Sequence, residues 1–352
     1  MKRPIATILC LAIGISALAG CSDKTDTTSG SSVTSEVTTE TTVETTEETT
    51  VETTEARGHY EFKPVVMSSI FREIMGEDMV EAYANYVEAF RNGEDSFAVK
   101  DANTYDWMIG QFPRRFYPVA EVYTESNYGS GYSDGTGTFQ YKIPVEEFAA
   151  KNTEFEELVT NILNENLRDD YSDFEKVLAL YIYIARNYTY DYETYYEMQD
   201  HSVADLSAYR FLTTGTGICS ECAPAYSYLL LQAGVDATCC GGYDHEWSYV
   251  TINGRNYHVD ATYAMGSDVC LSYLMMTDSR RETADGFPKS DNTIGCHYRD
   301  DHNGDQYDAD DDFFAPLYGM TLSDWDPVAN IIYCYDMDGN ELEFDYSEFE
   351  NR

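Results

Sequence analysis

The sequence is poor in basic residues: 22 lysines and arginines stand against 63 aspartates and glutamates, and the formal net charge is −41 at pH 7. A chain this acidic repels the phosphate backbone, which excludes nucleic acid as a partner. Its nine cysteines in 352 residues are too sparse for a disulfide scaffold. Aromatic residues, in contrast, are plentiful, with 31 tyrosines and 16 phenylalanines. This composition predicts a folded protein rather than a globally disordered one.

The one long apolar run lies near the first residue. Lys2 and Arg3 precede an apolar stretch from Ile5 to Ala19 that ends in Leu-Ala-Gly before Cys21. This pattern resembles the lipobox of bacterial lipoproteins. The resemblance implies that residues 1–20 are a signal peptide, and that a lipidated Cys21 anchors the exported protein to the outer face of the cell membrane. An ordinary secretory signal followed by a chance cysteine is the alternative.

Residues 21–57 are of low complexity and rich in threonine and glutamate. Such a segment buries too little apolar surface to fold, so we predict a disordered, extended tether. It contains nine acidic residues against two basic ones, and residues 1–20 contain two basic ones, which leaves −36 for residues 58–352. Most of the negative charge is therefore expected on the folded part.

Residues 58–170 are predicted to form a supporting α+β region. Apolar residues at helical spacing predict a helix over 79–90, and alternating patterns predict strands over 116–123 and 138–143. Thr153, with a glutamate three residues later, predicts the start of a second helix. No catalytic constellation is visible in this region.

Residues 171–352 are predicted to form the catalytic domain. Ser172 and Glu175 match a capping box that opens a helix. Seven tyrosines between Tyr181 and Tyr196 fit either amphipathic packing or an aromatic platform for carbohydrate. Near the C-terminus, Asp338-Gly339 predicts a hairpin that closes the domain.

Cys219 is the first candidate for chemistry. An apolar face continues from Cys222 to Ala233, and Gly234 ends the helix. Because proline is tolerated in a first helical turn, Pro224 predicts a start near Ser220, with Cys219 at the cap. Free amides and the helix dipole there favour a thiolate and could stabilise an oxyanion. Cys222, on the apolar face, is predicted to be a small buried hydrophobe.

A base and its orienting group are predicted on a hairpin downstream. Asn253-Gly254 between two alternating runs indicates a two-residue turn, which pairs Trp247 with Asp260. His245 is then a diagonal neighbour of Asp260 on the same face. Asp260 could hold the imidazole while its other nitrogen takes a proton from Cys219. This is a Cys-His-Asp arrangement.

These motifs together resemble the transglutaminase-like superfamily. They are Gly-x-Cys ending at Cys219, His-x-Trp starting at His245, and Tyr-His-Val-Asp-x-Thr containing Asp260. The resemblance implies an α+β fold with a papain-like core, in which the nucleophile lies at a helix N-terminus packed on an antiparallel sheet. It also implies that Cys219 is the nucleophile, His245 the base and Asp260 the orienting carboxylate.

Several positions depart from the family pattern. Family members often have Gly or Asp where Glu221 stands, an aromatic residue at Cys222, and Asn at Ser248. The departures leave the second oxyanion donor and the substrate fit open. Glu221 and Trp247 are retained as candidates for supporting the site or binding substrate; Trp247 could equally shield the triad or fill the core.

Two rival interpretations concern the same residues. His258, two residues from Asp260 and paired with Tyr249 in the predicted hairpin, competes with His245 as the base. A zinc site is the second rival, with ligands drawn from Cys219, Cys222, Cys239, Cys240 and His245. Because Pro224 and the apolar stripe place Cys222 inside a helix, the helix is favoured over a zinc knuckle, and no metal or cofactor is predicted. Cys239 and Cys240 are adjacent in a predicted strand, so we expect only one of them to face the core.

Two further possibilities remain open in the sequence. A disulfide could involve Cys239 or Cys240, or one of Cys270, Cys296 and Cys334. Residues 301–312 partly match a calcium loop, but Gln306 replaces the glycine that such a loop needs. A solvated acidic loop is the favoured interpretation.

The sequence therefore predicts a membrane-tethered extracellular thiol enzyme that attacks amide or peptide carbonyls through an acyl-enzyme intermediate. Hydrolysis, as by a cysteine peptidase or amidase, is favoured over transfer to an amine, as by a transglutaminase. Expected partners are the membrane, through the lipid anchor, and protein or peptide substrates of the cell envelope, with basic ones favoured by charge. The alternative is a non-catalytic surface module for binding or adhesion on the same fold.

Overall fold

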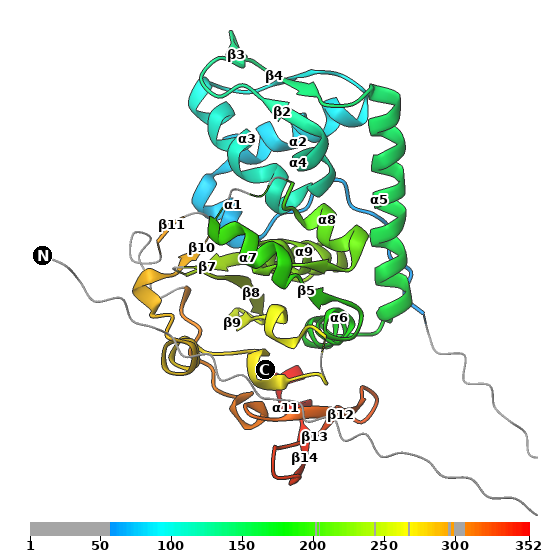
Figure 1. Ribbon diagram of the computed structural model, residues 1–352, viewed down its shortest axis with the longest axis vertical. Coiled ribbons are helices and arrows are strands. Elements are labelled where there is room, and N and C mark those ends of the chain that lie inside the picture. Colours follow the sequence, from blue (N-terminus) through cyan, green and yellow to red (C-terminus); the bar gives the residue numbers. More distant parts are fainter. Residues whose placement is uncertain are drawn as a thin grey trace, which may run out of the picture. The chain divides into compact units, whose positions relative to one another are not determined.

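A computed structural model describes residues 57–352 except 201, 202, 204, 243, 267, 295, 296 and 299–306 (Figure 1). The predicted signal peptide, the lipidation site Cys21 and all of the tether up to residue 56 lie outside the described residues. The part described is a mixed α+β structure with antiparallel sheets.

Residues up to 166 form mainly helices around one small sheet. The helices are α1 (Ser69–Met75), α2 (Glu77–Arg91), α3 (Ala102–Phe116), α4 (Pro118–Tyr123) and α5 (Val145–Asn166). The sheet contains β1 (Ser96–Ala98), β2 (Thr124–Ser126), β3 (Tyr132–Ser133) and β4 (Thr136–Tyr141). The predicted helix over 79–90 and the strand near 138–143 are confirmed as α2 and β4.

Two predictions for this region are wrong. Residues 116–123 end α3 and form α4, because Pro118 at the start of α4 favours a new helix and the apolar side chains pack against other helices. Thr153 lies inside α5, which begins eight residues earlier at Val145. Its hydroxyl bonds the carbonyl of Ala149 at 3.0 Å, one turn back, instead of capping a helix.

Most of the remaining chain up to 298 surrounds a five-stranded sheet. Its helices are α6 (Asp173–Asn187), α7 (Tyr192–Asp200), α8 (Ala208–Thr214), α9 (Cys219–Ala233) and α10 (Asp278–Arg280). The sheet order is β11 (His297–Tyr298), β10 (Thr293–Ile294), β7 (Asp236–Gly241), β8 (Glu246–Ile252) and β9 (Arg255–Val259). The predicted capping box at the start of α6 is present, with Ser172 and Glu175 bonding each other's backbone amides.

The five-stranded sheet is covered on both faces. Helix α9 packs against β7 and β8 (Figure 1), where Ser227 of the helix meets Ser248 of β8 at 2.8 Å. Trp247 and Tyr249, which alternate with Ser248, belong to a second buried cluster. Cys239 and Cys240 are consequently both buried, one toward each face. The two cysteines thus do not face the same core, as expected, and both are buried because the sheet is covered on both faces.

The hairpin of β8 and β9 has the predicted register. Ser248 pairs with Val259 and Tyr249 with His258. The turn between them requires positive φ at both central residues, and Asn253 and Gly254 have φ values of 52° and 73°. The same register continued outward brings Trp247 opposite Asp260.

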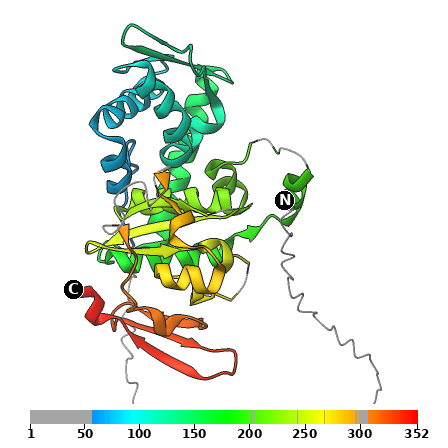
Figure 2. The ribbon, with the colours of Figure 1, turned by 90° about the vertical axis from the view of Figure 1, so that its left-hand side faces the viewer.

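The chain ends in a third antiparallel sheet and a short helix (Figure 2). Strands β12 (Thr321–Asp326), β13 (Ile331–Tyr335) and β14 (Glu341–Asp345) are followed by α11 (Ser347–Glu350). The predicted closing hairpin around Asp338-Gly339 is confirmed by the pairing of β13 with β14. A separate parallel pair joins β5 (Thr189–Tyr190) to β6 (Thr216–Gly217).

Candidate active site

Cys219 is the first residue of α9 and follows β6 with only Ile218 between them. The helix thus begins one residue before the predicted start, and Ile218 takes the cap position with extended backbone angles. The first amides of a helix have no intrahelical acceptor. The backbone N–H groups around Cys219 are therefore available to an oxyanion beside its thiol.

Pro224 is the sixth residue of α9. It therefore lies beyond the first turn, where the sequence predicted it. Proline has no N–H, so the carbonyl of Ser220, four residues earlier, loses its helical donor. Arg114 of α3 supplies a replacement, because its Nη2 donates to this carbonyl at 3.3 Å and to Glu246 of β8 at 2.6 Å. The N-terminal region thus contributes one arginine that joins the start of α9 to the sheet.

Glu221 holds the start of α9 from inside the protein. Its side chain has no exposed surface and accepts hydrogen bonds from the backbone N–H of Ile218 at 3.1 Å and of Ser207 at 3.0 Å. Arg210 of α8 forms an ion pair with the same carboxylate. Of its two candidate roles, the geometry favours support of the site, because a fully buried side chain cannot contact a substrate.

His245 and Asp260 form a buried pair. The distance between His245 Nε2 and Asp260 Oδ2 is 2.7 Å, and their side chains are 10% and 0% exposed. Cys219 is near enough to the imidazole to contribute to its raised pKa. With Nε2 donating to Asp260, the second ring nitrogen remains for the thiol. The structure therefore places the three residues predicted from the sequence next to one another, with His245 bonded to Asp260.

The charges of this pair depend on each other. Burial lowers the pKa of His245, but Asp260 and Cys219 outweigh it and raise that pKa to about 10. Burial works against ionisation of Asp260 as well. His245, Arg281 and the N–H of Thr262 together still hold the pKa of Asp260 below its usual value. At neutral pH the pair is consequently an imidazolium and a carboxylate.

Aromatic rings surround the imidazole. Tyr263, Phe287 and Trp247 have ring centroids 5.0, 5.7 and 5.9 Å from that of His245. Phe287 and Trp247 lie nearly parallel to it, at 22° and 24°. These rings fix the orientation of the imidazole and exclude water, which strengthens the interaction with Asp260.

Arg281 is a member of the site that the sequence did not reveal. Its side chain is fully buried in a π-helical turn (Arg281–Asp285), and Nη1 lies 3.3 Å from Asp260 and 2.8 Å from Asp285. The guanidinium lies 4.1 Å above the ring of Trp247. It occurs 21 residues after Asp260 in a segment without a regular apolar pattern, so no sequence signal pointed to it.

His258 has no ring nitrogen left for Cys219. Trp247 donates its indole N–H to His258 Nδ1 at 2.8 Å, and His258 Nε2 lies 2.8 Å from Asp278 Oδ1. An indole nitrogen only donates, so Nδ1 accepts and Nε2 carries the proton toward Asp278. The geometry therefore favours His245 over His258 as the base. The same contact shows that Trp247, which is 1% exposed, acts inside the protein as the hydrogen-bond donor to His258.

The other thiols and acids do not form a second site in the part of the chain described. Burial raises the pKa of Cys222, as expected for an inert buried thiol, and the thiols of Cys270 and Cys334 are free. Cys296, the third candidate for a disulfide, and residues 301–306 of the calcium-like segment lie outside the described residues. Within that description, no group of three His, Cys, Asp or Glu side chains is arranged to hold a metal ion.

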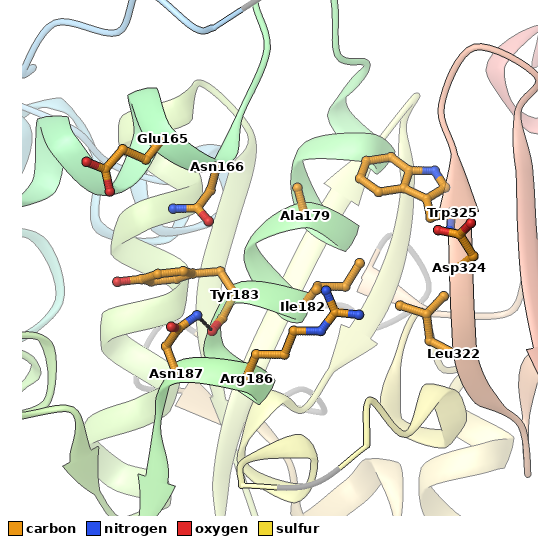
Figure 3. Close-up of a pocket in the computed structure, with 10 residues that line it drawn as sticks. All are labelled: Glu165, Asn166, Ala179, Ile182, Tyr183, Arg186, Asn187, Leu322, Asp324 and Trp325. Atoms are coloured by element: carbon orange, nitrogen blue, oxygen red, sulfur yellow. Dashed lines mark hydrogen bonds between the residues drawn. The ribbon is translucent and has the colours of Figure 1, made fainter. Parts of the chain in front are cut away.

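One cavity lies apart from these residues. It has a volume of about 380 Å³ and is lined by residues of α5, α6 and β12, including Tyr183, Arg186 and Trp325 (Figure 3). A hydrogen bond of 2.9 Å from Asn187 to the carbonyl of Tyr183 lies at its wall. No residue of the Cys219 site lines this cavity.

Comparison with known proteins identifies the class. Residues 160–268 match the family model of the transglutaminase-like superfamily, so this part of the chain is a transglutaminase-like domain. The matched residues contain Cys219, His245 and Asp260. The fold is accordingly α+β with a transglutaminase-like core, as the sequence predicted. No curated protein matches the chain.

Two solved structures show a distant similarity. One is titled as a putative cysteine protease from Cytophaga hutchinsonii, at 19% identity and a TM-score of 0.25, covering 40% of this chain and 46% of that one. The other is Rad4–Rad23 bound to a 6-4 photoproduct lesion, at 9% identity and a TM-score of 0.17, covering 79% of this chain and 49% of the other. The chain thus aligns with about half of either solved chain. In the described residues, no helix is both long and apolar enough to cross a membrane.

Proposed function

We propose that the protein is a thiol enzyme that attacks amide or peptide carbonyls through Cys219, His245 and Asp260. The observation that carries the proposal is the buried His245–Asp260 pair, bonded at 2.7 Å, with Cys219 beside the imidazole at the start of α9. The transglutaminase-like class of residues 160–268 supports it, because this class includes cysteine-protease-like enzymes.

The proposed reaction has two stages. The Cys219 thiolate attacks the carbonyl carbon, a C–S bond forms, and the oxyanion is stabilised by amides at the start of α9. The C–N bond then breaks as His245 gives its proton to the leaving amine, which leaves an acyl group on Cys219. His245 next takes a proton from water, the resulting hydroxide attacks the acyl carbon, and the C–S bond breaks. Hydrolysis is favoured over transfer to a second amine because water is abundant.

The cellular setting is also a proposal. Residues 1–20 and Cys21 support export and lipid attachment to the outer face of the membrane, and residues 21–57 would act as the tether. Residues 58–170 are proposed as a supporting region, because Arg114 contacts both α9 and β8. A Cys21→Ser variant should lose incorporation of a fatty-acid probe and enter the medium; retention of the probe would contradict lipidation.

Mass spectrometry of Cys219 after incubation with cell-envelope peptides tests the chemistry. We expect an added acyl mass on Cys219 that disappears with time in water and is absent in Cys219→Ala. Faster loss in the presence of a primary amine, with the amine appearing in the product, would indicate transfer instead of hydrolysis. Failure of every peptide to acylate Cys219 would favour a non-catalytic binding module.

A further inference from the structure

Helix α7 exposes a patch of tyrosines to solvent. Tyr192, Tyr195 and Tyr196 are 64%, 39% and 65% exposed, whereas large aromatic side chains elsewhere in the described core are mostly buried. We call these three residues the α7 tyrosine patch. Amphipathic packing, the favoured interpretation of the tyrosine-rich segment, therefore fails for this patch. Exposed aromatic groups of this kind are typical of binding surfaces.

The patch is connected to the candidate nucleophile through strand β5. Tyr190 pairs with Gly217 of β6, two residues before Cys219, and Asp191 N–H bonds the Gly217 carbonyl at 2.9 Å. The ring of Tyr190 lies 4.9 Å from Tyr192 and 6.0 Å from Tyr195. Burial is the main cause of the raised pKa of the Tyr190 phenol, and the nearby Cys219 raises it further. The patch thus begins two residues after a strand that is paired with the segment leading into α9.

The rings are inclined to one another rather than coplanar. The interplanar angles are 60° for Tyr190 and Tyr192, 57° for Tyr190 and Tyr195, and 68° for Tyr195 and Tyr196. Inclined rings can present their negative faces to a compact cation. A sugar chain stacks best on rings that share a plane, so this geometry favours a cation over a glycan.

Two carboxylates on the same helix add negative charge. Glu193 and Glu197 are exposed and one turn apart, and within the described chain neither forms an ion pair. Like charges at this spacing destabilise an isolated helix. A cation bound between the tyrosines and these carboxylates would relieve that repulsion.

We propose that the α7 tyrosine patch, with Glu193 and Glu197, binds a lysine or arginine side chain of a polypeptide substrate. The bound side chain is recognised and not consumed: it positions a neighbouring carbonyl at Cys219. The reaction of that carbonyl at Cys219 rests on the proposed function. Recognition of the cation does not depend on it and is measured separately.

Binding is measured in the full-length protein with Cys219→Ala, so that no chemistry intervenes. The probe is a fluorescein-labelled decapeptide of glycine and alanine that contains two lysines, and its partner carries two acetyl-lysines instead. Fluorescence anisotropy should show about five- to tenfold tighter binding of the lysine peptide. The preference should fall with added salt.

Two pairs of substitutions test the residues. Tyr192→Leu with Tyr196→Leu, and separately Glu193→Gln with Glu197→Gln, should each bring the preference close to one and leave acetyl-lysine binding unchanged. Tyr128→Leu removes an equally exposed tyrosine on the β2–β3 connection. Glu341→Gln with Glu343→Gln removes the same charge from β14. Both controls should retain the preference.

Equal binding of the two peptides, or a preference that survives the α7 substitutions, would overturn the proposal. Binding of a neutral chitin oligosaccharide that is lost in the tyrosine variant would replace it with glycan recognition. Acylation of Cys219 is measured in parallel with the same peptides and the intact thiol. A lysine preference without acylation would contradict the proposed function and retain the cation site.

Discussion

The indole N–H of Trp247 donates to Nδ1 of His258 across the β8–β9 hairpin at 2.8 Å. The two histidines near Asp260 are thereby distinguished. His258 is completely buried and bonded through both nitrogens, whereas His245 bonds Asp260 through one nitrogen and faces Cys219 with the other.

This difference predicts unequal effects of the two histidines on thiol reactivity. At pH 7, His245→Gln should slow alkylation of Cys219 by iodoacetamide at least tenfold, because the nucleophile then loses its base. His258→Gln should change the rate less than threefold. Peptide mapping separates Cys219 from the partly exposed Cys270. A slower rate in His258→Gln alone would make His258 the base.

The raised pKa of His245 predicts a pH-dependent stability. An imidazolium stabilised by the fold contributes fully below its unfolded pKa, near 6.5, and loses its contribution as pH rises through the folded value of about 10. The free energy of unfolding should therefore decrease between pH 6.5 and 10, by an amount on the order of a few kcal/mol.

Asp260→Asn should flatten that decrease, because it removes the main group that raises the pKa of His245. NMR titration of the His245 ring provides the direct measurement, with a midpoint near pH 10 in the wild type and a lower one in the variant. A wild-type midpoint below 7 would contradict the assignment of charges.

Glu121 of α4 predicts a pH-dependent effect of a buried acid, in contrast to the buried base His245. Its Oε2 is buried without a hydrogen-bond partner in the described structure, and burial raises the pKa of Glu121 to about 7 despite the nearby Arg114. An acid with a raised pKa destabilises the fold as pH rises from its unfolded value through the folded one. Glu121→Gln should therefore stabilise the protein by about 2 kcal/mol at pH 8 and by little at pH 4. Chemical denaturation at both values measures this, and equal effects at both would contradict it.

Glu221 and Arg210 predict a strong energetic coupling. Glu221→Ala should reduce the free energy of unfolding by about 3 to 5 kcal/mol, because it leaves the Arg210 guanidinium without its main partner and the Ile218 amide without an acceptor. In a double-mutant cycle, Arg210→Ala with Glu221→Ala should cost clearly less than the sum of the single changes. An additive result would show that the pair contributes little.

Local signals in the sequence predicted the parts of the fold that depend on neighbouring residues. The Asn253-Gly254 turn determines the register of the hairpin, and with it the approach of His245 to Asp260. The strand expected over 116–123 was wrong because alternating apolar residues also occur where a helix is buried by distant segments. Arg114 and Arg281 were missed for a related reason. Each reaches the site from an element whose packing no short motif encodes.

The position of Pro224 shows the same dependence on distant residues. A proline in the second turn of a helix normally disrupts it, and here an arginine from another helix bonds the carbonyl that lost its donor. The sequence alone could place the proline in the first turn only, and the start of α9 was therefore predicted one residue late.

The parallel pairing of β5 with β6 has a geometric consequence. Tyr190 and Gly217 are registered across two backbone strands, so α7 and Cys219 are connected by hydrogen bonds rather than by a flexible loop alone. Strand β5 ends two residues before α7 begins, so the chain from this paired strand to the tyrosines is short. For the proposed cation site, this short connection predicts a preferred number of residues between the anchoring side chain of a polypeptide and the carbonyl presented to sulfur.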